Sequence, residues 1–365
     1  MSPKSGSDYD PRETRSPQPF IELMALERLD DSPGDVRGPE KVEHFSSLAA
    51  PFPPGESMMA FGGHVCAQSA YAASQTVESG FVINNMTGSW ILPGRLDIPY
   101  VYTVRHIRDG KLYCTRAIDA RQDGKICFSG ICSFKLREKG TFNHQPLAGH
   151  HRFNSILNGK RPEEFPPSPG VDTDWWIEYI EESGVEEREF PGVDVRKVDM
   201  KDYNQTEEVK RNPQRYRQLH LYSLKGSPEP QSTMSWSDIK AKEQAGEYDN
   251  LYACAHLYSC DRNSVTLIPR ALGHPVFTAL TSLTITVIFH QHGDSLRMID
   301  WNDGSKHRSE NLPKKWFLQE AWTPSSGENR AIHESYLWSP GGTLLATTIQ
   351  DSVFRPSGSS RDGKL

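Results

Sequence analysis

The chain has 365 residues, of which 36% are hydrophobic, and 41 basic against 47 acidic residues give it a net charge of -6. This balance offers no broad positive field for nucleic acid, and no apolar run approaches the ~18 residues that a membrane span needs. The length is enough for two domains of ordinary size. Residues 1–17 lack the apolar core of a signal peptide, so we expect a disordered N-terminal arm and no secretion.

The first half of the chain predicts a helix followed by a run of strands. Residues 61–77 open on a glycine pair, and nine of the thirteen residues from Gly62 to Ser74 are Gly, Ala, Ser or Cys. Side chains this small let a helix lie close against a sheet, so we expect this helix to be buried. The Asp-Gly pairs in RDGK and QDGK predict β-hairpins between the later strands. Strand patterns occur at 81–92, 98–108, 112–121 and 125–136.

Residues 139–189 change character, because they are rich in proline and then in acidic residues, with little strand or helix periodicity. We interpret them as a linker between two domains. A second irregular stretch at 222–238 is expected to be a loop inserted within the later domain.

After the linker, the order of a helix followed by strands recurs. The segments QDGKICFSGICSF and PGGTLLATTIQDS match locally, and aligning Gly124 with Gly342 puts Cys132 opposite Gln350. We therefore predict an internal duplication. Its second copy comprises strands near 190–200 and 215–224, a helix at 248–268, and strands at 280–290, 296–301, 315–323, 331–338 and 343–354.

Gln350 is an unusual residue for its place in an apolar strand. A buried amide without partners costs roughly 1–3 kcal/mol, so either ordinary neighbours satisfy it or it holds a ligand. The first copy has a cysteine, Cys132, at the matching position. This asymmetry favours a functional role for Gln350.

Two further polar residues of the second copy accompany this amide. Asp261 falls at the edge of the apolar stripe of the 248–268 helix, where an ion pair with Arg262 is the plainest alternative. Thr286 lies on the 280–290 strand, where threonine is common for its strand propensity alone. Together, a carboxylate can accept a proton from water while a hydroxyl and an amide fix its position. This set indicates hydrolysis without a protein nucleophile.

The six cysteines form no CxxC pair, and most of them fall within apolar helix or strand patterns. We expect reduced core cysteines of an intracellular protein, not a disulfide framework or a zinc site. His290 and His292 could face the same side of a strand, but no third ligand accompanies them at a convincing spacing. We expect solvated or core histidines there, and no metal or other cofactor.

At this point the sequence resembles the type II acyl-CoA thioesterases, which are double hot-dog enzymes. The resemblance covers most of 18–138 and 190–356. It rests on FGGHVCAQ at 61–68, LPG at 92–94, VRHIRDGKLYCTR at 104–116, YSCD at 258–261 and LLATTIQDSVFR at 344–355.

The resemblance implies an α+β fold with two antiparallel sheets, each wrapped around a central helix. The domains would be an N-terminal hot-dog at 18–138, a linker at 139–189, a C-terminal hot-dog at 190–356 and a flexible tail at 357–365. It also implies hydrolysis of a fatty or related acyl-CoA to the free acid and CoA.

In the resembled family, an Asp, a Ser or Thr, and a Gln orient the hydrolytic water, and these carry over to Asp261, Thr286 and Gln350. The sequence departs from the family pattern at three places: 284–286 read TIT instead of Asp-His-Ser/Thr, Gln291 replaces an Arg, and 84–90 read NNMTGSW. These departures keep a non-catalytic acyl-CoA-binding protein of a biosynthetic pathway open as an alternative. A hot-dog acyl-CoA hydratase or dehydratase is the other alternative, although Asp261 has no motif-linked His.

Substrate-binding groups are expected at two places. The helix start at Gly62, Gly63 and His64 offers backbone N–H groups for a developing oxyanion. Arg105 and Arg108 are candidates for binding the phosphates of CoA, although a solvated hairpin is the preferred interpretation of these residues.

The last three residues, Gly363-Lys364-Leu365, are similar to the Ser-Lys-Leu address read by the peroxisomal import receptor. We expect a peroxisomal location ahead of a cytoplasmic one, and a role in lipid and fatty acid metabolism. Association of copies into a homo-oligomer through the hot-dog sheets is left open.

Overall fold

The computed structural model describes most of the chain. The expected N-terminal arm, residues 1–17, and the terminal Gly363-Lys364-Leu365 lie outside the described residues. Described are residues 18–30, 41–55, 57–185, 187, 189–230, 234–302 and 312–357.

The strands of the described part form one twelve-stranded sheet, and every neighbouring pair in it is antiparallel. The strands of the N-terminal half are β1 (Leu26–Leu29), β2 (Val42–Ser47), β3 (Val82–Trp90), β4 (Val101–Asp109), β5 (Tyr113–Gln122) and β6 (Lys125–Lys135). Those of the C-terminal half are β7 (Val193–Lys197), β8 (Gln218–Leu224), β9 (Phe277–Phe289), β10 (Phe317–Gly327), β11 (Arg330–Trp338) and β12 (Leu344–Pro356).

The two halves repeat one topology. The sheet order is β1-β2-β4-β5-β6-β3 in the first half and, read from the opposite edge, β7-β8-β10-β11-β12-β9 in the second. The halves meet where β3 pairs with β9, and Thr87 lies opposite Thr286 in that pairing. Cys132 and Gln350 occupy equivalent places, because each sits on the strand next to this junction. The duplication predicted from the sequence is confirmed as a repeated topology.

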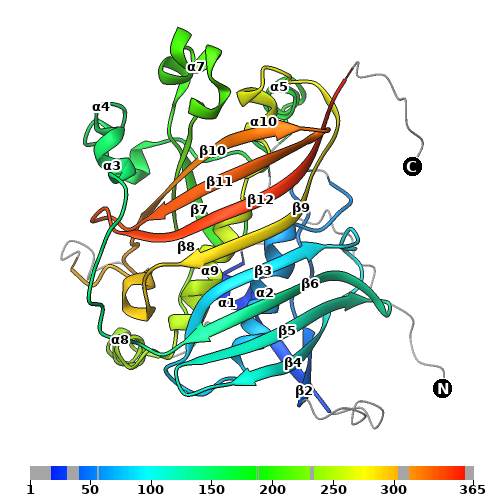
Figure 1. Cartoon of the computed structure of the whole chain (residues 1–365), viewed down its shortest axis with the longest axis vertical. Helices are drawn as coiled ribbons and strands as arrows, with labels where there is room; N and C mark the ends of the chain where they lie inside the picture. The colour runs from blue at the N-terminus through cyan, green and yellow to red at the C-terminus, as the bar shows by residue number, and fades with distance from the viewer. Residues whose placement is uncertain are drawn as a thin grey trace.

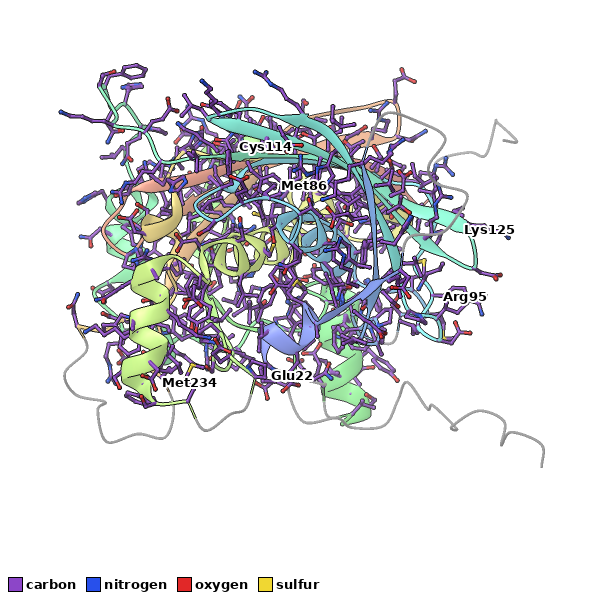
Figure 2. All side chains as sticks on the ribbon, turned by 90° about the horizontal axis from the view of Figure 1, so that it is seen from below. Glu22, Met86, Arg95, Cys114, Lys125 and Met234 are labelled. Carbon is purple, nitrogen blue, oxygen red and sulfur yellow. The ribbon has the colours of Figure 1, made fainter. Side chains whose placement is uncertain are left out.

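Each half contributes one long helix beneath the sheet, α2 (Gly62–Ser74) and α9 (Asp249–Asp261). The two helices pack against each other behind the sheet (Figure 1), and the view along the sheet shows it arching over them (Figure 2). A single hydrophobic core joins residues of both helices and both halves. The fold is therefore the expected double hot-dog.

Shorter elements surround this frame. The segment expected as a linker contains α3 (Gly149–Arg152), α4 (Asn154–Leu157), a 3-10 turn at Pro162–Glu164 and the ten-residue α5 (Asp174–Ser183). Other short helices are α1 (Phe20–Leu23), α6 (Lys201–Asn204), α7 (Glu207–Arg211), α8 (Trp236–Ala245) and α10 (Leu267–Ala271), with 3-10 turns at Pro213–Arg215 and Gly293–Leu296.

One predicted strand is absent, and one predicted helix is shorter than expected. The expected strand at 296–301 does not form, and only Ile299 makes an isolated bridge, to Lys314. The helix expected to run over 248–268 ends at Asp261, because Arg262 is extended and Asn263 has a left-handed backbone with φ of 55°. This early end matters, because it places Asp261 at the terminus of α9.

All six cysteines are free and buried, as predicted. None of the helices in the described part is long and apolar enough to cross a membrane.

Candidate active site

The site forms where the start of α2 meets the end of α9. A Cβ on Gly62 would lie 3.1 Å from Asp261 Oδ2 and 2.9 Å from Trp90 Nε1, and one on Gly63 would lie 3.0 Å from the backbone oxygen of Tyr258. Larger residues would push the two helices apart. The glycine pair therefore allows the first turn of α2 to contact the carboxylate that ends α9.

Asp261 and Gln350 form a direct pair. Nε2 of Gln350 donates a 2.7 Å hydrogen bond to Oδ1 of Asp261, although the two residues are 89 positions apart. Asp261 is 9% exposed, while Gln350 is fully buried. Its other amide atom, Oε1, has no hydrogen-bond partner among the described residues. A carboxylate only accepts, so its contact fixes the amide with Nε2 toward Asp261 and leaves Oε1 able to accept from a further donor.

The environment of Asp261 changes its proton affinity. Burial raises the pKa of the Asp261 carboxyl above its ordinary value, since the charged form loses water. Hydrogen bonds from Gln350, Ser264 and the backbone N–H of Gly63 favour the charged form and offset part of the rise. A carboxylate with a raised pKa is a better proton acceptor than an exposed one.

A cavity of ≈ 780 Å³ opens beside Asp261 and is mostly apolar. Its volume lies within the range of small-molecule sites. Gly62 and Asp261 line it at the helix ends, Trp90 at the end of β3, and residues 281–283 at the start of β9. The carboxylate thus faces a space large enough for an organic substrate.

The structure does not bring Thr286 to this group, and that expectation needs correction. Thr286 lies opposite Thr87 of β3, and their hydroxyl oxygens are 3.2 Å apart. Its neighbour Ile285 is fully buried and pairs with Gln350. Directly paired residues share a face and successive residues alternate, so Thr286 points to the face of the sheet opposite Asp261.

Ser282 is the hydroxyl that the structure offers instead. It pairs with Ser352, which lies two residues after Gln350 and is fully buried on the same face. Ser282 also lines the cavity. Simple alternation from Ile285 would turn Ser282 outward, but the pairing register shifts between Thr284 and Ser282. Sequence reasoning missed this residue because a bulge of this kind leaves no periodic signal.

The remaining expected site residues divide into two groups. Gly62 lines the cavity and Gly63 contacts Asp261. His64 is fully buried, lies 3.3 Å from Gln68 through its Nε2, and does not line the cavity; burial lowers its pKa to about 4.

Arg105 and Arg108 also lie away from the cavity. Both belong to β4, which two strands separate from β3 in the sheet. Their side chains are exposed, and Arg105 faces Asp119 at 3.9 Å. The structure therefore does not bring the two arginines to the Asp261 site.

No group of three or more potential metal-binding side chains occurs among the described residues. His290 contacts the Thr347 hydroxyl oxygen at 2.8 Å, and His292 the backbone oxygen of Lys135 at 3.0 Å. The two histidines thus have separate protein partners.

Comparisons with known proteins find similarity to acyl-CoA thioesterases. Residues 48–135 match the family model of the acyl-CoA thioesterase N-terminal domain. The rat acyl-coenzyme A thioesterase 8 is 25% identical over 317 residues, which cover 85% of this chain and 84% of that protein. Acyl-CoA thioesterase 2 of Haemophilus influenzae is 28% identical over 146 residues, 40% of this chain and 43% of that protein.

Solved structures show the same fold. The acyl-CoA thioesterase II TesB2 of Mycobacterium marinum has a TM-score of 0.58 and 20% identity, over 94% of this chain and 99% of that one. A hot-dog protein of Alicyclobacillus acidocaldarius has a TM-score of 0.59 and 15% identity, over 92% and 97%. The chain is thus similar in sequence to acyl-CoA thioesterases over most of its length, and it shares the fold of a type II enzyme. Asp261 and Gln350 both belong to the second hot-dog, and Asp261 lines the cavity there.

Proposed function

We propose that this protein hydrolyses acyl-CoA thioesters by direct attack of water, with Asp261 as the general base. The observation that carries this proposal is the 2.7 Å hydrogen bond from Gln350 to Asp261, which lines an apolar cavity. The thioester carbonyl would lie beside Asp261, with the acyl chain in the cavity.

Asp261, Gln350 and Ser282 each have a different role in activating or positioning the water. Asp261 accepts the proton as the water oxygen bonds to the carbonyl carbon. The free Oε1 of Gln350 accepts a hydrogen bond from the same water, and the Ser282 hydroxyl is the proposed third contact in place of Thr286. Holding the water near the carbonyl reduces the entropic part of the barrier.

The first turn of α2 stabilises the negative charge that develops on the thioester carbonyl oxygen. As the carbonyl oxygen becomes an oxyanion, the backbone N–H of Gly62 and the positive end of the helix stabilise it. The C–S bond then breaks, the proton held by Asp261 returns to the leaving thiolate, and the free acid and CoA depart.

One observation argues against each alternative, the hydratase or dehydratase and the non-catalytic binding protein. Hot-dog hydration or dehydration uses a histidine with an acidic residue, but the described side-chain partners of Asp261 are Gln350 and Ser264. A purely binding role leaves unexplained why a carboxyl whose pKa is raised lies at the cavity.

The deciding experiment measures free CoA released from a panel of acyl-CoA thioesters. We expect Asp261→Asn to lower kcat by at least roughly a hundredfold, the scale of a lost general base. The amide keeps the shape of the side chain, so acyl-CoA binding is expected to persist. Full turnover in this variant would refute the assignment of the base, and binding without turnover in the native protein would support the binding alternative.

The cellular setting stays a prediction from the sequence. We propose a peroxisomal location and capture by the import receptor through Gly363-Lys364-Leu365. Residues 354–365 fused to a fluorescent reporter test this, and a diffuse signal would favour the cytoplasm. Association of copies through the sheets is tested by measuring the molar mass in solution.

A further inference from the structure

The outer side of the cavity is built by residues 168–183, which we call the wall segment. It belongs to the stretch expected as a linker and ends in α5. Val171, Trp175, Trp176 and Tyr179 of this segment line the cavity together with Asp261. A connection between the two hot-dogs therefore also shapes the space beside the carboxylate.

The wall segment is fastened directly to the residues that follow Asp261. The buried guanidinium of Arg262 donates to the backbone oxygens of Pro169 and Gly170, both at 2.6 Å, and to that of Ser168 at 3.3 Å. The side chain of Asn263 accepts from the backbone N–H of Asp172 at 3.0 Å. Arg262 and Asn263, the two residues directly after Asp261, thus attach the wall segment beside the carboxylate.

Further contacts hold the wall segment from its other side. The buried Asp172 carboxylate pairs with Lys197 at 2.7 Å and with Arg270 at 2.9 Å. Glu187 accepts from the indole N–H of Trp176 at 2.6 Å, and Trp176 is 4% exposed. With these buried contacts, the segment has the character of a packed wall and not of a free linker.

Trp175 is the member of the wall that is placed to contact a ligand. Its indole lines the cavity but is 50% exposed, in contrast to its neighbour Trp176. Phe277 and Leu280 of β9 line the same cavity. A large aromatic surface beside an apolar space gains most when an apolar ligand covers it.

We propose that the distal part of the acyl chain lies against Trp175, so that this residue selects for acyl groups long enough to reach α5. This inference rests on the proposed thioesterase function and assigns Trp175 as a residue that determines its chain-length preference. Short acyl groups occupy the cavity beside Asp261 and do not reach the indole.

The test compares kcat/KM across a series of straight-chain acyl-CoA thioesters from acetyl to hexadecanoyl. We expect Trp175→Ala to lower the ratio of kcat/KM for hexadecanoyl-CoA to that for acetyl-CoA by roughly tenfold, a loss typical of a removed apolar contact. Phe142→Ala is the matched control, because Phe142 is a 91% exposed aromatic of the same linker and does not line the cavity. An equal effect of Trp175→Ala on all chain lengths would overturn the inference.

A second measurement separates this inference from the proposed function. Binding of the same acyl-CoA series is measured by calorimetry on Asp261→Asn protein, with and without Trp175→Ala. If Trp175→Ala weakens the binding of only the longer acyl chains, the proposed role of Trp175 is supported even if the native protein shows no hydrolysis. If binding is independent of Trp175 at every acyl-chain length, the proposed role of Trp175 is refuted, whatever the hydrolysis assay shows.

Discussion

At the residue scale, the chemistry of the site depends on the contact between Asp261 and Gln350. Burial makes Asp261 hold a proton more tightly, and the amide of Gln350 opposes this by donating to the charged form. The balance of these two effects sets the pH at which the base becomes available.

The pKa of Asp261 is expected to appear in the pH profile of kcat/KM. The base works only when ionised, so activity should fall as the pH drops through the raised pKa, above the ordinary Asp value of ~4. Gln350→Ala removes a hydrogen bond to the charged form and should move this acid limb to still higher pH. An acid limb at the ordinary value, or one that Gln350→Ala leaves in place, would contradict the assignment.

The choice between Ser282 and Thr286 can be made with two isosteric deletions. Ser282→Ala should lower kcat by roughly tenfold, which corresponds to the loss of one hydrogen bond of about 1.4 kcal/mol. Thr286→Val should leave kcat nearly unchanged, because its hydroxyl faces Thr87 on the other side of the sheet. The reverse order of effects would restore Thr286 to the site.

At the element scale, the break after α9 does two things at once. It ends the helix at Asp261, and it frees Arg262 and Asn263 to bind the backbone of the wall segment. Asp172 completes the attachment by pairing with Lys197 of β7 and Arg270 of α10. The position of α5 over the cavity therefore depends on buried charges, and the stability of this attachment should depend on pH.

Asp172→Asn is predicted to lower the free energy of unfolding by about 3 kcal/mol at pH 7, as expected when a buried ion pair loses one partner. Burial alone would raise the pKa of Asp172, but Lys197, Arg270 and His220 lower it overall. A lowered pKa means that the stabilisation is present above the unfolded pKa and is lost as the pH falls through the folded one. The difference between the two proteins should therefore shrink in acid.

Asp174→Asn provides the control for this measurement. Asp174 also pairs with Arg270, at 2.7 Å, but it is about half exposed. Its loss should cost less than about 1 kcal/mol, because exposed pairs are screened by solvent. Urea unfolding at several pH values compares the two, and equal costs would show that Asp172 is not the anchor.

At the scale of the whole molecule, the fold is a duplicated unit whose two halves meet along β3 and β9 (Figure 1) and through α2 and α9. Asp261 ends α9 beside the glycine pair that begins α2, whereas α2 itself ends at Ser74. The close approach of the helices is thus needed both for the common core and for the single site.

Gly63→Ala tests this close approach. The added Cβ would lie 2.5 Å from the ring of Phe61, which is packed against Tyr258, and 3.0 Å from the backbone of Tyr258. We expect a loss of about 1–3 kcal/mol in urea unfolding from overpacking. Gly140→Ala, where a Cβ meets nothing within 4 Å, should change stability by less than about 1 kcal/mol. Equal stability of both variants would mean that the helices can separate without cost.

The amino-acid sequence by itself determined the repeated order of helix and strands, the burial of the small-residue helix, and Asp261 and Gln350 as candidates. These features follow from local periodicity and from polar residues that stand out in apolar patterns. The tertiary structure decided what local patterns do not encode. The shift in the β9 register turned Ser282 inward and left Thr286 outside, and the buried charges around Asp172 made part of a proline-rich connection into a wall of the site. Both depend on contacts between residues far apart in the chain, whose energies no single segment contains.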